Sequence, residues 1–227
     1  MVDNRGMSSY LLKITLRGTP NLVWRRFVVP SFTSLSRLHE VIQDVMGWQR
    51  KHPHAFYFRK QEYLPTAGGL KGKALPEEMF SLDDLIYQSG ARLKYHYDPD
   101  GDKWVHDIAV ESIRYIDSEW PYPMYCLEGV RACPPENCGG ATGYGELLKL
   151  LKNSEHPQHG EFVKNFGDFD PERFSVEKVN KFFKVKGPVD RSGNVILPIL
   201  KRERTLNTEK IDPLQILGQR LKKKAVS

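Results

Sequence analysis

The sequence predicts an α+β domain in which an antiparallel or mixed sheet packs against one long helix. Three observations lead to this class: apolar alternation at residues 10–16, a helical apolar stripe at 34–46, and two later alternating segments joined by turn residues. The order strand, strand, helix, strand and then hairpin is typical of an α/β roll resembling the β-grasp arrangement.

Two strands are expected at the start of the domain. Residues 10–16 place their apolar side chains on one face, because successive side chains of a strand alternate. A turn at 18–21 leads to residues 24–29, which end at Pro30 and form the antiparallel partner. The pair predicts the first hairpin of the sheet.

A helix is expected from residue 34 to residue 46. Ser34 or Thr33 is suited to cap its first turn, and Gly47 is suited to end it. Its apolar residues recur at helical spacing, which predicts a buried face. These residues are Leu35, Leu38, Val41, Ile42, Val45 and Met46.

The next segments alternate between strand and loop character. Residues 54–58 predict a strand, whereas 61–76 are rich in Gly, Lys and Pro and predict a projecting loop, long enough to act as a lid. Residues 92–97 and 103–113 predict a hairpin, joined through 99–101, where glycine supplies the positive φ of a tight turn.

Helices are expected at about 145–151 and 176–183, after an irregular stretch rich in Pro and Cys, and Ser175 caps the second. A short basic helix is expected to begin at Pro213. The predicted organisation is an N-terminal tail (1–9), one α+β domain (10–187) and a flexible basic tail (188–227).

Composition bounds the function classes. Hydrophobic residues make up 40% of the chain and charged residues 27%, with no apolar run that could span a bilayer and no secretory signal at the start. A cytoplasmic protein without a membrane partner is therefore expected.

The net charge of +6 is concentrated at the end of the chain. Residues 189–227 hold nine Lys/Arg and four Asp/Glu, which gives +5 and leaves about +1 for the body. Nucleic-acid contact is therefore expected from the tail, unless the tail is only a solvated segment. The tail residues proposed for this contact are Lys201, Arg202, Arg204, Lys222, Lys223 and Lys224.

Two separated clusters carry most of the polar chemistry: residues 98–106 and residues 126–140. Strand alternation places Asp102, Trp104 and His106 on the inward face, and likewise His54 on its own strand. A carboxylate such as Asp102 can fix the tautomer of a histidine that acts as a ligand or a general base. The candidate site is His54, Asp102, Trp104, His106 and Glu136; the alternative is a set of core histidines bonded to backbone.

No cofactor is certain from the sequence, and zinc is the one for which it offers candidate ligands. Three cysteines and no secretory signal indicate a reducing compartment, where thiols bind metal or lie buried rather than pair. Zinc is bound by thiolates and imidazoles that converge as a tetrahedron. The candidate ligands are His52, His54, His106, Cys126, Cys133 and Cys138, against the alternative of buried thiols.

Other chemistries have weaker signals. The aspartates at 98, 100 and 102 lack the glycine and terminal glutamate of a calcium loop. The glycines at 139–145 precede a helix and could cradle an anion, but no Gly-Lys-Ser/Thr follows. No nucleophile elbow is present. His156 and His159 are explained equally well by a metal cluster or by a polar surface segment.

With these residues in view, the chain resembles the plasmid Ri ORF-3-like family, an uncharacterised group found on plasmids, in chromosomes and as passengers of insertion sequences. The resemblance spans about residues 10–183 and implies an α+β fold without an assigned activity. Its motifs are Leu38-His-Glu-Val-Ile-Gln43 with Gly47-Trp48, His52-Pro-His54-Ala-Phe56, Gly101-Asp-Lys-Trp-Val-His106, Cys133-Pro-Pro-Glu-Asn-Cys-Gly-Gly140 with Gly143-Tyr144, and Phe169-Asp-Pro-Glu-Arg-Phe174 with Val179-Asn180. The chain departs from the family at Tyr97-Asp-Pro-Asp-Gly-Asp102, where the family has Tyr-Asp-Phe-Gly-Asp.

The absence of a catalytic signature favours a non-enzymatic binding or accessory module, linked through the resemblance to plasmids or mobile elements. In this hypothesis the two clusters stabilise the junction of the sheet with the irregular stretch. The alternative is a zinc-dependent enzyme or a zinc-stabilised domain that uses the His, Asp and Cys clusters.

Overall fold

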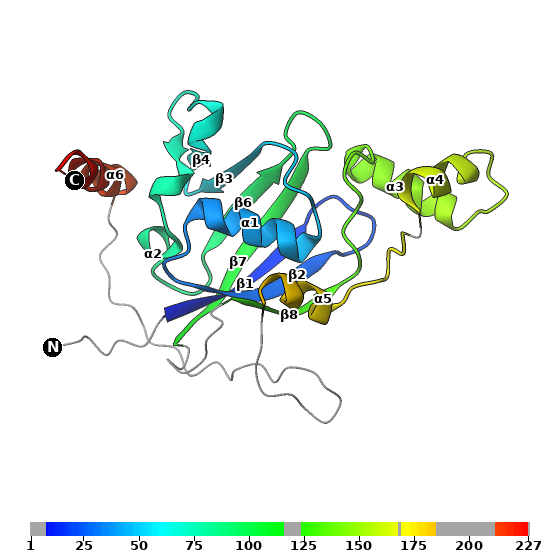
Figure 1. Ribbon diagram of the computed structural model, residues 1–227, viewed down its shortest axis with the longest axis horizontal. Coiled ribbons are helices and arrows are strands. Elements are labelled where there is room, and N and C mark those ends of the chain that lie inside the picture. The colour runs from blue at the N-terminus through cyan, green and yellow to red at the C-terminus, as the bar shows by residue number, and fades with distance from the viewer. Residues whose placement is uncertain (1–7, 116–123, 168, 185–211, 227) are drawn as a thin grey trace.

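The computed structural model describes residues 8–115, 124–167, 169–184 and 212–226. Its centre is a mixed sheet with the strand order β5-β4-β3-β6-β7-β1-β2-β8. All strand pairs are antiparallel except β4 with β5, which are parallel. Several helices accompany the sheet (Figure 1), so the predicted α+β class is confirmed.

The strands and helices of the described residues follow one another along the chain. They are β1 Ser8–Leu16, β2 Trp24–Pro30, α1 Leu35–Met46, β3 His54–Phe58, β4 Gln61–Leu64, η1 Thr66–Gly68, β5 Leu75–Pro76, η2 Glu77–Met79, α2 Leu82–Leu85, β6 Arg92–Tyr97, β7 Trp104–Tyr115, β8 Tyr125–Val130, α3 Gly140–Leu151, α4 His159–Phe166, α5 Val176–Phe182 and α6 Pro213–Val226.

Helix α1 has the caps that its sequence predicts. The hydroxyl of Ser34 accepts the N–H of Arg37 at 3.1 Å, which satisfies one of the free donors of the first turn. Gly47 ends the helix with φ 89°, and its N–H donates to the carbonyl of Gln43 at 2.8 Å. The predicted first hairpin is also confirmed, with Tyr10 opposite Val29 in the register.

The core lies between α1 and one face of the sheet. Helix α1 crosses in front of the strands in Figure 1, and its apolar stripe is buried against them. Leu38, Val41 and Ile42 have no exposed surface. Burying a side chain of this size stabilises the fold by about 1.5 to 3 kcal/mol.

Three predictions about irregular segments are wrong. The expected loop at 61–76 contains β4 and β5, because Gln61–Leu64 pairs with β3 as the second strand of a hairpin. Strand β8 lies in the stretch expected to be irregular, where it pairs with β2. Helix α3 begins at Gly140, five residues earlier than expected.

The turn between β6 and β7 also differs from its prediction. The positive φ angles belong to Asp98 (53°) and Lys103 (57°), and not to Gly101. A Cβ at Gly101 would lie 2.3 Å from a carboxylate oxygen of Asp98, so glycine is needed for space. That carboxylate accepts the N–H of Asp102 at 2.7 Å and closes the turn.

Arg25 fastens three elements together from inside the core. Only 1% of this residue is exposed, and its guanidinium lies 3.9 Å from the ring centre of Phe174. Its N–H groups donate to four carbonyl oxygens at 2.7–2.9 Å: those of Trp24, Val45, Val130 and Arg131. Strand β2, the end of α1 and the end of β8 are thereby joined.

Strand β8 forms one edge of the sheet, and α5 lies along it (Figure 1). Asn180 of α5 accepts the N–H of Cys126 at 2.7 Å and donates to the carbonyl of Cys126 at 2.9 Å. The amide side chain therefore pairs with the edge as a neighbouring strand would.

The helix predicted to begin at Pro213 is confirmed as α6. It packs on α2 through buried Ile216, and Arg220 contacts the carboxylate of Asp84 at 2.6 Å and the carbonyl of Met79. Within the described part of the chain, no helix has both the length and the apolar character needed to cross a membrane.

Candidate functional site

A buried layer of histidines and aromatic rings lies between α1 and the sheet. His39 of α1 and His54 of β3 stack face to face, with ring centres 3.5 Å apart and planes 2° from parallel. The Nε2 atom of His54 lies 2.9 Å from a carboxylate oxygen of Glu77, which is 1% exposed. His54 is thus buried as predicted, and its partners are a helix residue and a carboxylate.

Tyr95 connects this pair to His106. Its hydroxyl lies 2.7 Å from Nδ1 of His39 and accepts the amide of Gln43 at 3.1 Å. Its carbonyl oxygen lies 3.3 Å from Nδ1 of His106. His106 is fully buried on the inward face, as predicted, but its ring is oriented by backbone and not by Asp102.

Burial determines the protonation of these rings. Desolvation lowers the pKa of His106 to about 3, and desolvation together with the nearby His54 and Arg50 lowers the pKa of His39 to about 3. Both imidazoles are therefore neutral near pH 7. The Nε2 atom of His106 is buried and has no hydrogen-bond partner among the described residues.

Trp48, directly after α1, links the layer to the cysteine-containing segment. Its ring centre lies 5.2 Å from that of His106 and 5.0 Å from that of Tyr97. Its indole N–H donates to the carbonyl of Pro134 at 2.9 Å. The residue therefore joins the core of the sheet to residues 133–140.

Glu136 lies at the same junction. One carboxylate oxygen accepts the hydroxyl of Tyr97 at 2.6 Å, and the other accepts the N–H of Gln49 at 3.1 Å. Burial and the hydrogen bond to Glu136 raise the pKa of the Tyr97 hydroxyl. Both oxygens of this candidate residue are committed to contacts within the protein.

Asp102 brings the two polar clusters of the sequence together. Its Oδ1 accepts the N–H groups of Gly139 and Gly140, each at 3.0 Å, and its Oδ2 accepts the indole N–H of Trp104 at 3.2 Å. Gly140 has φ 66°, and a Cβ there would lie 2.4 Å from the carbonyl oxygen of Asp102. The close approach requires glycine, and the carboxylate fastens the hairpin to the start of α3.

The cysteines lie in apolar or backbone surroundings. Cys126 is buried, with Sγ 3.6 Å from the carbonyl of Arg26, and Cys138 has Sγ 3.9 Å from that of Gly140. Burial raises the pKa of the Cys126 and Cys138 thiols to about 12 and raises that of Cys133 as well. Thiols in this state are poor nucleophiles.

The predicted metal ligands are distributed over several places. His52 lies with Nδ1 3.4 Å from the Asp98 carboxylate, and its buried Nε2 has no partner within the described residues. Over the described ranges, no group of three or more His, Cys, Asp and Glu side chains is arranged to hold a metal ion. Of the tail residues, Lys201, Arg202 and Arg204 lie outside the described residues, and Lys222 is exposed on α6.

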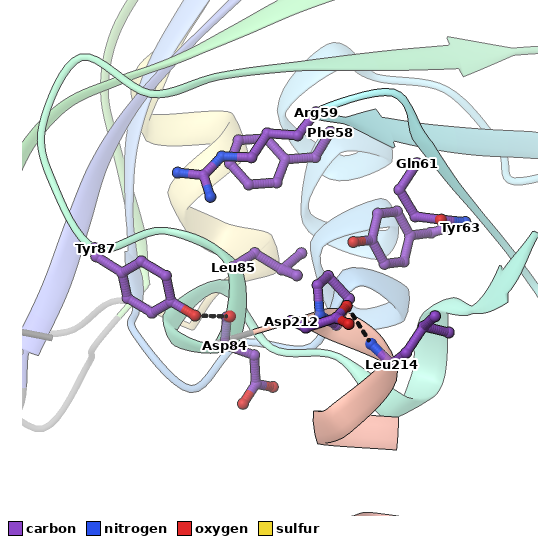
Figure 2. A pocket seen from close by; sticks show the side chains of 10 residues that line it. Phe58, Arg59, Gln61, Tyr63, Asp84, Leu85, Tyr87, Asp212 and Leu214 are labelled. Atoms are coloured by element: carbon purple, nitrogen blue, oxygen red, sulfur yellow. Dashed lines mark hydrogen bonds between the residues drawn. The ribbon is translucent and has the colours of Figure 1, made fainter. Parts of the chain in front are cut away.

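A cavity of about 250 Å³ lies where the β3–β4 hairpin, α2 and the start of α6 meet (Figure 2). Asp212 borders it and accepts the N–H of Leu214 at 3.0 Å, while the hydroxyl of Tyr87 donates to the carbonyl of Asp84 at 2.5 Å. Its polar groups are thus partly used in fastening the surrounding segments.

Sequence reasoning missed His39, Gln43, Glu77 and Tyr95, which hold the buried layer together. The signal for the first two was present, because positions 39 and 43 are four residues apart beside the apolar stripe of α1. Glu77 had no such signal, since it comes directly after Pro76, the last residue of the segment expected to be a loop.

Comparisons with known proteins identify one family and two similar proteins. The family described as "Plasmid pRiA4b ORF-3-like protein" matches residues 8–178. The uncharacterized protein y4hQ of Sinorhizobium fredii (strain NBRC 101917 / NGR234) is 36% identical over 175 residues, covering 75% of this chain and 88% of the relative. The crystal structure of MM3350 from Methanosarcina mazei Go1, a protein of unknown function, is similar with a TM-score of 0.67 and 32% identity, covering 76% of this chain and 97% of that one.

Proposed function

Because the chain belongs to the plasmid pRiA4b ORF-3-like protein family, we propose that it is a non-enzymatic binding or accessory module linked to mobile DNA. In this proposal the two polar clusters stabilise the fold. The link to mobile DNA is supported by the plasmid in the family's description.

One observation carries the proposal: the side chains suited to chemistry are either buried or held by hydrogen bonds within the protein. His106 and Trp104 are 0% and 1% exposed, and both carboxylate oxygens of Asp102 accept hydrogen bonds. A general base must reach a proton of its substrate, and a nucleophilic thiol needs a lowered pKa. The described surroundings supply neither condition, which supports a structural role for these residues.

A zinc-stabilised domain is the second candidate. It is favoured by the buried Nε2 atoms of His52 and His106, which have no hydrogen-bond partner among the described residues. An unpaired buried nitrogen is costly, and a metal ion would satisfy it. Among the predicted ligands, Cys133 and Cys138 belong to the segment 133–140, which Trp48 connects to His106.

Elemental analysis of protein purified without a metal-affinity tag separates the two candidates. The binding-module proposal expects roughly 0.1 zinc per chain or less, with three reactive thiols on unfolding. His106→Ala is then expected to lower stability by about 2 kcal/mol through loss of packing alone. The matched control is His156→Ala, on the segment between α3 and α4, with a change of about 0.5 kcal/mol or less.

About one zinc per chain, lost in both Cys133→Ser and His106→Ala, would overturn the metal-free proposal. It would favour the zinc candidate and justify assays with hydrolase substrates. Retention of zinc in both variants would instead place the metal elsewhere in the chain and exclude these residues as its ligands.

A further inference from the structure

The face of the sheet opposite α1 carries side chains that the core does not use. Directly paired residues of neighbouring strands share a face, and Tyr57, Lys94 and Asp107 are paired in register across β3, β6 and β7. The alternating residues of β6, such as Tyr95, are buried under α1. Lys94 therefore points to the outer side, where it is exposed.

A groove of about 620 Å³ runs over this face. We call it the sheet-face groove. Its lining residues come from the β3–β4 hairpin and from the neighbouring strands β6 and β7. They are Tyr57, Phe58, Arg59, Lys60, Arg92, Leu93, Lys94, His96 and Asp107.

The groove has an excess of positive charge. Arg59, Lys60, Arg92 and Lys94 are exposed and form no ion pair with the described residues. The one acidic residue of the lining, Asp107, lies 3.3 Å from Arg17 and is already paired. A face of this kind attracts an anionic partner, since no carboxylate in the described part of the chain forms an ion pair with these four cations.

Glu62, paired with Tyr57 in the hairpin register, carries a negative charge that offsets one of the four lining cations. Its carboxylate accepts the hydroxyl of Tyr57 at 2.6 Å, so it is held at the hairpin. By contrast, Arg26 farther along the same face is neutralised by Glu111 and Glu128. An excess of three positive charges, four cations against Glu62, therefore lies at the groove, although the body of the chain carries only about +1.

Two rings lie among the cations. Tyr57 and His96 have ring centres 4.6 Å apart with planes inclined by 49°, and both residues are half-buried. Burial and the neighbouring charge of Lys94 lower the pKa of His96, so its ring is neutral near pH 7. Aromatic rings interleaved with cations are the arrangement on which single-stranded nucleic acids bind, with bases stacked and phosphates paired.

The hairpin that borders the groove holds two of the cations in an unusual conformation. Arg59 and Lys60 form its two-residue turn with φ 48° and 67°. Positive φ at both positions favours Asn and Gly, and long side chains adopt it at a conformational cost. The presence of two cations at a turn with this conformational cost supports a role for their charge.

We propose that the sheet-face groove binds single-stranded nucleic acid, with Arg59, Lys60, Arg92 and Lys94 on the phosphates and Tyr57 and His96 against the bases. The inference rests on the proposed function as a binding module and names its partner. The chemistry favours a single strand over a duplex, because the bases of a duplex are stacked on each other and their faces are closed.

The test is fluorescence anisotropy of the full chain with a labelled 20-nucleotide DNA or RNA strand of mixed sequence, from low to moderate salt. The double charge reversal Arg92→Glu with Lys94→Glu is expected to weaken binding by about tenfold. It should also reduce the slope of log K against log salt by about 1.4, at about 0.7 for each lost phosphate contact. The matched control, Lys152→Glu with Lys178→Glu, reverses two exposed cations elsewhere and should change affinity less than about twofold.

A second variant separates stacking from charge. Tyr57→Leu removes the ring and is expected to weaken binding by about tenfold while leaving the salt slope unchanged, and Tyr57→Phe should bind like the parent chain. Circular dichroism and thermal melts establish that each variant is folded. This pair keeps the test valid even if a charge reversal disturbs the sheet.

Three outcomes would overturn the inference. In the first, the charge reversal in the groove and the matched control change the affinity for the single strand by the same factor. Another is affinity lost only when Lys201, Arg202 and Arg204 are replaced by Gln, which would assign binding to the tail. The third is duplex DNA binding as tightly as the single strand. None of these results bears on zinc content, so the failure of this site is distinguishable from the failure of the proposed function.

Discussion

Replacing Asp102 by alanine should destabilise the protein, because its carboxylate joins the β6–β7 hairpin to the start of α3. The change removes three hydrogen bonds, from the N–H groups of Gly139, Gly140 and Trp104. The carboxylate is half-buried and partly screened by water, so each bond is assigned about 1 kcal/mol, the typical net value for a protein hydrogen bond and below that for buried charged acceptors. Water can reach the exposed Gly139 but not the indole of Trp104, which is 1% exposed. The expected loss is about 2 to 3 kcal/mol.

Urea denaturation measures this loss directly, and a thermal melt should show a decrease of about 8 °C for a chain of this size. Asp100→Ala is the matched control, because Asp100 is exposed on the same turn and should change stability by about 0.5 kcal/mol or less. Asp102→Asn keeps an oxygen that can accept the N–H groups of the glycines, but its NH2 group would face the indole N–H of Trp104, and both groups are donors. The expected loss of stability therefore lies between that of the alanine variant and that of the control. An alanine variant as stable as the Asp100 control would refute the role of Asp102 as the fastening between the clusters.

Two other predictions follow from buried groups. Burial lowers the pKa of His39 and His106 from 6.5 to about 3. As the pH falls below 6.5, these histidines therefore bind protons in the unfolded chain before they do so in the folded one, and the free energy of unfolding should be full above about pH 6.5 and decrease toward pH 3. In His106→Leu the fall between pH 6 and 4 should be shallower by about 1.4 kcal/mol per pH unit, and an unchanged slope in urea melts would contradict the assignment. Arg25→Lys should lower the free energy of unfolding by about 3 kcal/mol in the same assay, since an ammonium group cannot reach the four carbonyl groups that the guanidinium binds. A loss below about 1 kcal/mol would show that the planar guanidinium is not needed.

The elements with periodic apolar residues were predictable because signals within each segment are enough to specify it. Helix α1 has a cap, an apolar stripe and a terminating glycine, and the apolar residues of strand β1 alternate from Tyr10 to Leu16. The α+β class follows from their order, whereas a relation to the β-grasp arrangement stays a prediction. Strands β4 and β5 were missed because they have only four and two residues, within a segment rich in Gly, Lys and Pro, and β8 was missed because its partner β2 is distant in the sequence.

The candidate site was predictable in position more than in contacts. Alternation correctly placed Trp104 and His106 inside, because the side-chain period of a strand is fixed. Which group each one meets depends on packing between elements, so the stacking of His54 on His39 had no local signal. The sheet-face groove was missed for a similar reason, since total charge does not reveal how folding distributes it over faces.

The side chain of Asn180 determines what the edge of the sheet offers to other molecules. By occupying the N–H and carbonyl of Cys126, it removes a pair of backbone groups on which a strand of another chain could begin to pair. The opposite edge, β5, is two residues long and ends at Pro76, which has no N–H to donate. The protein thus blocks edge-to-edge aggregation at one end with a helix side chain and at the other with a short strand. Release of α5 would leave β8 open to self-association.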